Sequence, residues 1–480
     1  MKQLHLLALV VALSVSTLAD AATYTVSNLA DSGAGSLRAA LIAANASPGV
    51  DSIVFQPGLN GSIQLATAMS ISDPVTLFGP GPGLLTLRAA PNQRIFSLER
   101  PGLPRGSSVI AGLTLANGQA AEGGAILVTD ENLTLRDVIL RDNRAVNRGG
   151  AIRMDRGDLT LEDVDFDGNE AVGSTSSSDN GGALYFNGGN LVMKRGLIKN
   201  NRALYGGALY ITGVDARIED SLFMNNAARH TAGAIHTGSQ APPLHITRSA
   251  FVGNTCNEAI GAAIHYSGST SAGATAAVIE NTTFSGNSTP HSGGRGILAL
   301  LAGRMQLRNS TLANNRTATG TTASATDGGA VWVGSNATLD IESTLFSQNS
   351  HGNSAPPRWI DLSPSSAPTR TINLAHSLLH SSPASGVING SNTDNQFDID
   401  AQLGPLVVEG QGFVPVHPIP ATSAAIDRGS NPANLGTDQR GVGYPRAVDR
   451  IACRSHLLAR ADVGAYEYRT DTIFCNGFQP

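Results

Sequence analysis

The sequence predicts an all-β fold, a parallel β-helix with about three strands per coil, from three observations. A Gly-Gly-Ala-aliphatic motif begins at Gly123, Gly149, Gly181 and Gly206, and looser copies follow up to residue 331. An apolar residue three positions before an Asn recurs eight times, with Asn-to-Asn steps of 25 to 34 residues. The positions 10 and 8 residues before each Asn are mostly apolar, which is the alternation of a β-strand. A short unit repeated with insertions is typical of a solenoid.

Energetics favour stacked coils over isolated ones. About five inward apolar positions per coil contribute roughly 8–15 kcal/mol. Ordering a coil costs about 1–2 kcal/mol per residue, so a single coil is unstable alone. Stacking adds hydrogen bonds and a continuous core. We expect the repeated Asn to form an internal ladder at a turn, with a left-handed backbone, and the glycines to make tight corners.

The repeated motifs resemble the polymorphic outer-membrane-protein repeats and right-handed parallel β-helix proteins, including those of the pectin-lyase-like fold. The residues that carry this resemblance are the Gly-Gly-Ala-Ile copies and the Phe-x-x-Asn copies, such as Phe166 to Asn169 and Phe223 to Asn226. The resemblance implies a right-handed coil in residues 62–380. It implies little about activity, because the motif residues build the scaffold.

The N-terminal region predicts export and a cap. Residues 1–21 have the basic start, apolar stretch and small-residue end of a secretory signal peptide. Residues 22–61 are expected to cap the solenoid with a short strand at 24–27 and a helix that begins at Ser36 and ends at Pro48. An apolar helix stripe would cover the first open strand edge. The segment from Asp31 to Arg38 resembles the CSLREA-type region of secreted β-helix proteins, with Gly35 where that family has Cys.

The C-terminal region lacks the repeat. Residues 381–480 are predicted to form a small β module with a tail. Its sequences around Ser423, Asp438 and Asp462 resemble the choice-of-anchor Q module of bacterial surface β-helices. The short tail fits either a sorting signal or a closing strand. Cys453 and Cys475 are a candidate disulfide in an oxidising compartment, and Cys256 is expected to be a buried thiol.

Composition limits the classes of partner. The net charge is −5 and no basic cluster occurs, which argues against a nucleic-acid partner. No later stretch is long and apolar enough for a transmembrane helix, so we expect none after signal cleavage. The expected product is a monomer, secreted or held on the outer surface of a bacterium.

One outward column is the candidate site. The residue after each glycine motif should point outward, between the inward residues that flank it. This column consists of Leu127, Arg153, Tyr185, Tyr210, His236, His265, Leu298 and Trp332. Asp155 and Asn187 lie two positions after Arg153 and Tyr185. Aromatic faces stack on sugar rings, and Tyr and His can transfer protons. The alternative is that stacked rings only stabilise a parallel sheet.

Two other sets of side chains carry charge. The position seven before each Asn largely alternates in charge, which predicts a salt-bridge ladder: Arg136, Glu162, Lys194, Glu219, Thr247, Glu280, Arg308 and Glu342. Asp163, Asp165 and Asp167 alternate along one strand, which raises the possibility of Ca²⁺. However, Ca²⁺ needs six or more oxygen ligands and the adjacent coil offers Arg195 and Leu197. We therefore expect no metal site and no cofactor.

Two functions are consistent with these patterns. The first is an adhesin-like protein that binds an extracellular polysaccharide or surface glycan along the Tyr/His column. The second is a polysaccharide lyase or glycoside hydrolase acting on a polysaccharide that contains uronate. In the lyase, His236 would take the C5 proton, Tyr210 would protonate the leaving oxygen, and Arg153 would meet the carboxylate.

Overall fold

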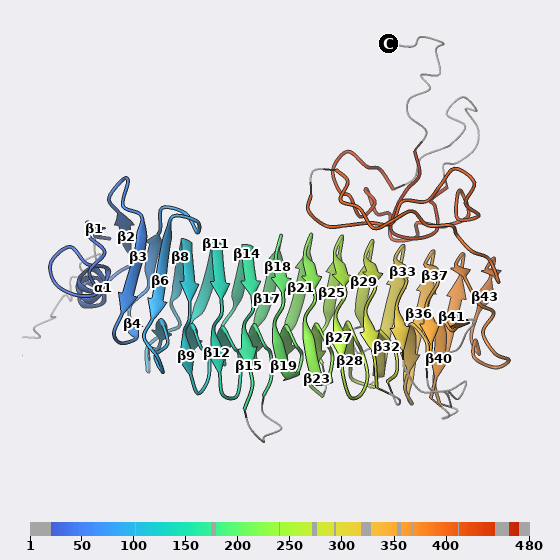
Figure 1. Ribbon diagram of the computed structural model, residues 1–480, viewed down its shortest axis with the longest axis horizontal. Helices are drawn as coiled ribbons and strands as arrows, with labels where there is room; N and C mark the ends of the chain where they lie inside the picture. The colour runs from blue at the N-terminus through green and yellow to red at the C-terminus, as the bar shows by residue number, and fades with distance from the viewer. Residues whose placement is uncertain are drawn as a thin grey trace, which may run out of the picture.

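The chain forms a parallel β-solenoid of about 11 turns, which confirms the predicted fold class (Figure 1). The computed structural model describes residues 21–100, 102–173, 179–239, 241–270, 276–291, 294–317, 328–352, 357–365, 369–410, 412–446 and 460–469. The signal peptide prediction, Cys453, Cys475 and most of the tail lie outside these residues. No helix in the described ranges is long and apolar enough to cross a membrane.

Three faces build the solenoid. The long face bends once in most coils and consists of β1 Thr23–Val26, β2 Asp51–Phe55, β3 Gly61–Leu65, β5 Val75–Phe78, β6 Leu85–Ala89, β8 Ser107–Ala116, β11 Asn132–Arg141, β14 Leu159–Asp167, β17 Asn190–Lys194, β18 Leu197–Lys199, β21 Asp215–Glu219, β22 Leu222–Met224, β25 Leu244–Thr247, β26 Ala250–Val252, β29 Ala277–Glu280, β30 Thr283–Ser285, β33 Thr311–Ala313, β36 Ala337–Glu342, β37 Leu345–Ser347, β41 Thr371–Ala375, β42 Leu378–Leu379, β43 Asn392–Thr393 and β44 Gln396–Phe397.

The ring face consists of β4 Met69–Ile71, β7 Phe96–Leu98, β10 Ile126–Val128, β13 Ile152–Met154, β16 Leu184–Phe186, β20 Leu209–Ile211, β24 Ile235–Thr237, β28 Ile264–Ser267, β32 Leu298–Arg308, β35 Val331–Val333 and β40 Leu362–Pro364. The long strand β32 continues from this face into the long face.

The short face consists of β9 Gln119–Ala120, β12 Arg144–Ala145, β15 Glu170–Ala171, β19 Arg202–Tyr205, β23 Ala227–Thr231, β27 Thr255–Cys256, β31 Ser288–Thr289, β34 Arg316–Thr317, β38 Ser350–His351 and β39 Arg358–Trp359. Its strands pair in parallel except for the final pair, β38 and β39, which is antiparallel.

The N-terminal cap has the predicted helix. α1, Leu37–Ala46, begins after Ser36, whose hydroxyl accepts a hydrogen bond from the Ala39 backbone N–H. This contact is an N-cap, which satisfies one of the free N–H groups of the first turn. The helix buries Leu37, Ala40, Leu41 and Ala44 against the first coils. The open end of the core is therefore covered, as predicted.

The glycine motif is explained by the close approach of neighbouring coils. At the second glycine of a motif, a Cβ on Gly207 would stand 2.2 Å from the Gly233 carbonyl oxygen, so there is no room for a side chain. The first glycine, such as Gly206, has a φ of +63°, which disfavours other residues. Both positions therefore favour glycine for reasons of scaffold, and the looser copies place Ala232, with a φ of +60°, at the first position and Ala262 at the second.

The predicted asparagine ladder is confirmed. In each of seven steps, the Nδ2 of one asparagine donates to the Oδ1 of the next at 2.9–3.0 Å. The final amide, of Asn349, donates to the buried Asp361 carboxylate at 3.0 Å. Burial raises the pKa of Asp361 to about 6. The expected left-handed backbone belongs instead to the preceding residue, as at Asn225 with a φ of +54°.

The alternating charge column is also confirmed as a set of ion pairs along the axis. Arg136 meets Glu162 at 2.9 Å, and Arg308 meets Glu280 at 3.0 Å. Lys194 and Glu219 stand further apart, at 3.9 Å. Each such exposed pair is worth about 0–1 kcal/mol, so the column fixes register more than it adds stability.

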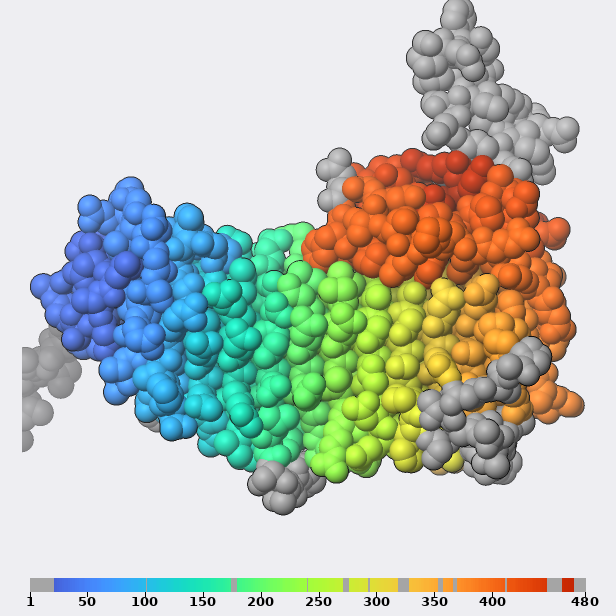
Figure 2. Space-filling model, in the orientation of Figure 1, coloured from blue at the N-terminus to red at the C-terminus, as the bar shows by residue number. Residues whose placement is uncertain are grey.

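The C-terminal module comprises the described parts of residues 398–469 and lies along the second half of the solenoid (Figures 1 and 2). It consists mostly of turns, with two antiparallel bridges, Val407–Val416 and Thr437–Pro445. The solenoid itself continues past Leu379, the last residue of the expected final coil, through β43 and β44.

The module docks on polar side chains of the long face and on an apolar cluster that includes Leu345 and Leu378. The Thr283 hydroxyl donates to Gln439 at 2.6 Å, and Ser285 contacts the His417 Nε2 at 2.9 Å. The Asn309 amide donates to the Ser430 carbonyl at 3.0 Å. These contacts hold the module against coils that lie 121 to 156 residues earlier in the sequence.

Candidate functional site

Four aromatic side chains form a continuous stack on the ring face, which we call the ring stack: Tyr185, Tyr210, His236 and His265. Their residues pair directly from β16 to β28. Successive ring centroids are 5.5, 4.8 and 4.6 Å apart, with interplanar angles of 14°, 20° and 5°. The period of the strands and the parallel register place these rings on one face.

The ring stack is largely covered by protein. Tyr185 is 9% exposed and His265 is 6% exposed, whereas Tyr210 and His236 are half-buried. Burial, with His265 nearby, lowers the pKa of His236 well below its usual value, and burial lowers that of His265 to about 4. Burial also raises the pKa of Tyr210, with Tyr185 as a second cause. The stack is therefore uncharged at neutral pH.

Beyond His265 the observed pairing differs from the predicted outward column. His265 pairs with Ala299, and Leu298 pairs with the inward Ile264, so the expected outward position of Leu298 is wrong. In this coil the inward residue after the degenerate glycine motif is Leu298 and not Ile297, so the outward position falls on Ala299. Trp332 pairs with Ala299 and is 7% exposed, so an alanine separates it from the ring stack.

The polar members of the predicted site lie on the same face but are already paired. Arg153 forms ion pairs with Glu122 and, at 2.8 Å, with Asp155. The Asn187 amide oxygen accepts a hydrogen bond from the Thr212 hydroxyl at 2.7 Å. Arg153 thus has two carboxylates beside it where the lyase hypothesis places a uronate.

The three aspartates considered for Ca²⁺ face basic side chains. Asp163 has a left-handed backbone at the bend of β14 and pairs with Arg195 at 2.7 Å. Asp165 and Asp167 each lie 3.4 Å from the Lys199 Nζ. Within the described ranges, no group of three His, Cys, Asp or Glu side chains is placed to hold a metal ion.

A cavity of about 700 Å³ lies beside the ring stack, on the short face; we call it the corner pocket. It is lined by Val172, Gly173, Asp179, Arg202, Ala203, Leu204, Tyr205, Ala227, Ala228, Arg229, His230, Asn257 and Glu258. The Tyr205 ring lies 5.6 Å from the His236 ring and 5.1 Å from the His230 ring. Tyr205 therefore connects the pocket with the ring stack.

The corner pocket carries both charge and aromatic surface. Arg229 and Glu258 form an exposed ion pair at 2.8 Å. Arg202 is exposed and forms no ion pair with the described residues. Cys256 lies just below the pocket, is buried, and donates to the His230 carbonyl oxygen at 2.9 Å. Burial raises its pKa to about 11, so it is a core thiol, as predicted.

Tyr205 and His230 are not part of the predicted site, because neither belongs to the column after the glycine motif. A signal for them exists in the spacing. The interval from ladder asparagine to glycine motif is five residues in the Asn201 coil and six in the Asn226 coil. The extra residue makes a bulge in β23, where Arg229 and His230 stand opposite Leu204 alone. Such bulges redirect side chains and are frequent beside binding sites.

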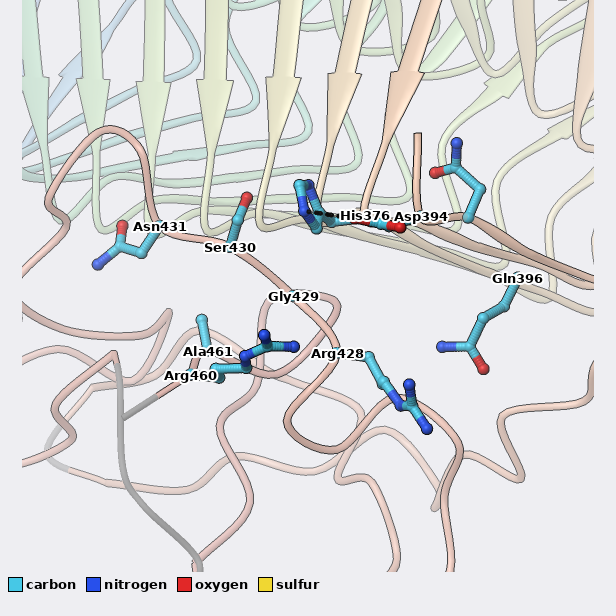
Figure 3. Close-up of a pocket in the computed structure, with 10 residues that line it drawn as sticks. His376, Asp394, Gln396, Arg428, Gly429, Ser430, Asn431, Arg460 and Ala461 are labelled. Atoms are coloured by element: carbon cyan, nitrogen blue, oxygen red, sulfur yellow. Dashed lines mark ion pairs between the residues drawn. The ribbon is translucent and has the colours of Figure 1, made fainter. Parts of the chain in front are cut away.

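A second cavity, of about 650 Å³, lies between the last coils and the C-terminal module (Figure 3). We call it the module pocket. His376, Asp394 and Gln396 line it from the solenoid, and Arg428 and Arg460 line it from the module. This pocket is not predictable from the sequence, because its shape depends on how the module docks on the solenoid.

The ring stack makes a testable pH prediction. His265 has a folded pKa of about 4 against about 6.5 when unfolded, so the unfolded state binds more protons below pH 6.5. The free energy of unfolding therefore decreases as the pH decreases. The contribution of His265 alone should fall by about 2 kcal/mol between pH 7.5 and pH 5. We expect His265→Phe, which keeps a ring, to lose that slope in urea unfolding. Parallel pH profiles for the variant and the natural chain would contradict this account.

No protein-family model matches the chain, and no curated protein matches it.

Proposed function

We propose that this protein binds glycans outside the cell, with the saccharide in the corner pocket against Tyr205 and His230. The observation that carries the proposal is a pocket of about 700 Å³ that combines two aromatic rings with Arg202, Arg229 and Glu258. Pockets for small ligands have volumes of about 300–1,000 Å³. Aromatic faces suit the apolar faces of sugars, while charged and amide groups suit their hydroxyls.

The proposal modifies the role of the Tyr/His column. Since Tyr185 and His265 are buried, the ring stack serves as a rigid wall behind the pocket, and Tyr205 presents the accessible ring. A rigid first layer supported by packed side chains favours binding, because little mobility is lost on association.

Location at the cell surface or in the medium is part of the proposal. Its support is the signal-like residues 1–21 and the resemblance of the repeats, the CSLREA-like segment and the choice-of-anchor Q-like motifs to bacterial surface β-helices. An adhesin-like role follows from that setting.

A lyase is the second candidate, favoured by one observation. At neutral pH the lowered pKa of His236 leaves its ring neutral, and the raised pKa of Tyr210 keeps its hydroxyl protonated. These are the protonation states of a general base and a general acid, but both pKa shifts lead away from neutrality and so make His236 a weaker base and Tyr210 a weaker acid. A uronate would then have to reach the half-buried rings through the corner pocket.

The experiment is calorimetric titration of the full chain with a panel of neutral and uronate-containing oligosaccharides. We expect one class to bind, and His230→Ala or Tyr205→Ala to weaken binding about tenfold, since a ring contact is worth about 0.5–1.5 kcal/mol beyond its buried area. His245→Ala is the matched control, because His245 lies on the long face.

The same mixtures separate the two candidates when they are followed for unsaturated uronate by ultraviolet absorbance. Binding without product supports the binding protein, and product that disappears in His236→Ala supports the lyase. Equal binding by the control and both pocket variants would refute the corner pocket as the site.

A further inference from the structure

The module pocket holds two arginines without an ion-pair partner among the described residues. Arg428 and Arg460 are both exposed and reach the cavity from separate segments of the module (Figure 3). In contrast, most described arginines of the solenoid's long face, such as Arg195 and Arg248, are paired with a carboxylate of the adjacent coil. The two guanidinium groups of Arg428 and Arg460 at one cavity are therefore available to a ligand.

The opposite wall supplies groups of a different kind. His376 stands between two carboxylates, 3.7 Å from Glu342 and 3.6 Å from Asp394. Figure 3 shows the contact with Asp394. Both carboxylates therefore lie beside His376, on the solenoid side of the cavity. Gln396 adds an amide on this wall. The cavity is cationic on the module side and rich in hydrogen-bonding groups on the solenoid side.

We propose that the module pocket binds the anionic group of an acidic glycan, a uronate carboxylate or a sulfate ester. Guanidinium groups match both groups in shape, with paired N–H donors aimed at two oxygens. Asp394 and Gln396 can meet sugar hydroxyls on the other wall. A cavity of about 650 Å³ accommodates a saccharide unit. The inference does not rest on the corner pocket, which is a separate cavity on the short face.

The test is calorimetric titration of the full chain with sodium glucuronate, sodium sulfate and glucose at matched ionic strength. We expect at least one anion to bind at least tenfold more tightly than glucose, and the double variant Arg428→Gln/Arg460→Gln to lose at least about tenfold, or about 1.4 kcal/mol. Tighter binding of glucuronate identifies a carboxylated glycan, and tighter binding of sulfate identifies a sulfated one.

Arg316→Gln provides the matched control, since Arg316 is an exposed arginine of β34 on the short face. It should bind the anion as the natural chain does. The double variant should keep the binding of neutral oligosaccharides that is assigned to the corner pocket, so failure of the corner pocket and failure of the module pocket are distinguishable. The proposal is overturned if neither anion binds, if glucose binds equally well, or if the double variant matches the Arg316→Gln control.

Discussion

Replacing Arg440 by Ala is expected to destabilise the C-terminal module by about 3–5 kcal/mol, because the change strands a buried charge. The Arg440 side chain is 3% exposed and pairs with the fully buried Asp438 at 2.6 Å and with Glu409 at 3.1 Å. Its guanidinium carbon lies 3.7 Å from the Tyr466 ring centre and 4.2 Å from that of Tyr444. The module also has a small apolar cluster that includes Ile419, Ile426 and Val463, so the Arg440 network is the buried polar part of its packing.

Hydrogen exchange measured by mass spectrometry would report the effect separately for each region. Peptides from residues 435–446 and 460–469 should lose protection in Arg440→Ala, while peptides around Asn226 in the solenoid keep it. Arg428→Ala is the control, since an exposed arginine of the same module should change stability by about 0.5 kcal/mol or less. Unchanged protection of both module peptides in Arg440→Ala would show that the network is dispensable.

The second large effect is expected for Asn226→Ala, at about 3–5 kcal/mol. The Asn226 side chain accepts from the backbone N–H and Nδ2 of Asn201 and donates to the Ile198 carbonyl and to Asn254 Oδ1, all at 2.8–3.0 Å. Its removal leaves several buried partners unsatisfied, and each costs about 1–3 kcal/mol when water cannot replace the bond.

Urea unfolding followed by circular dichroism would measure this loss. The matched control is Asn257→Ala, which removes an exposed amide from the following coil and should be nearly neutral. If the two variants unfold at the same urea concentration, the ladder contributes no more than a surface amide, and its role in holding the coils would be refuted.

The accuracy of the sequence predictions follows the range of the interactions. The ladder at Asn226 and the stacking of Tyr210 on His236 were predictable, because a repeated unit meets its own copy at a fixed spacing. The helix at Ser36 was predictable from local capping and an apolar stripe. All three depend on neighbours in sequence or on adjacent coils.

The errors arise where one residue is gained or lost, or where distant segments meet. The misplaced Leu298 and the unpredicted bulge at His230 each follow from a one-residue change within a coil. The burial of His265 could not be deduced from strand alternation. Alternation predicts that the side chain points outward from the sheet, but it does not predict which residues cover that side chain. The module pocket forms where the module segment with Arg428 docks beside the coil with His376, and no repeat encodes that docking.

The amide ladder has a direction, and this has a consequence for how such a chain can lengthen. It starts at the Gly118 N–H, which donates to Asn143, and it runs with every amide dipole aligned until the Asp361 carboxylate receives the final N–H. Interior units are therefore interchangeable: duplication or deletion of one leaves every amide with a partner, and only the terminal carboxylate is unique. Aligned dipoles also polarise one another, so a longer array would hold each member more firmly.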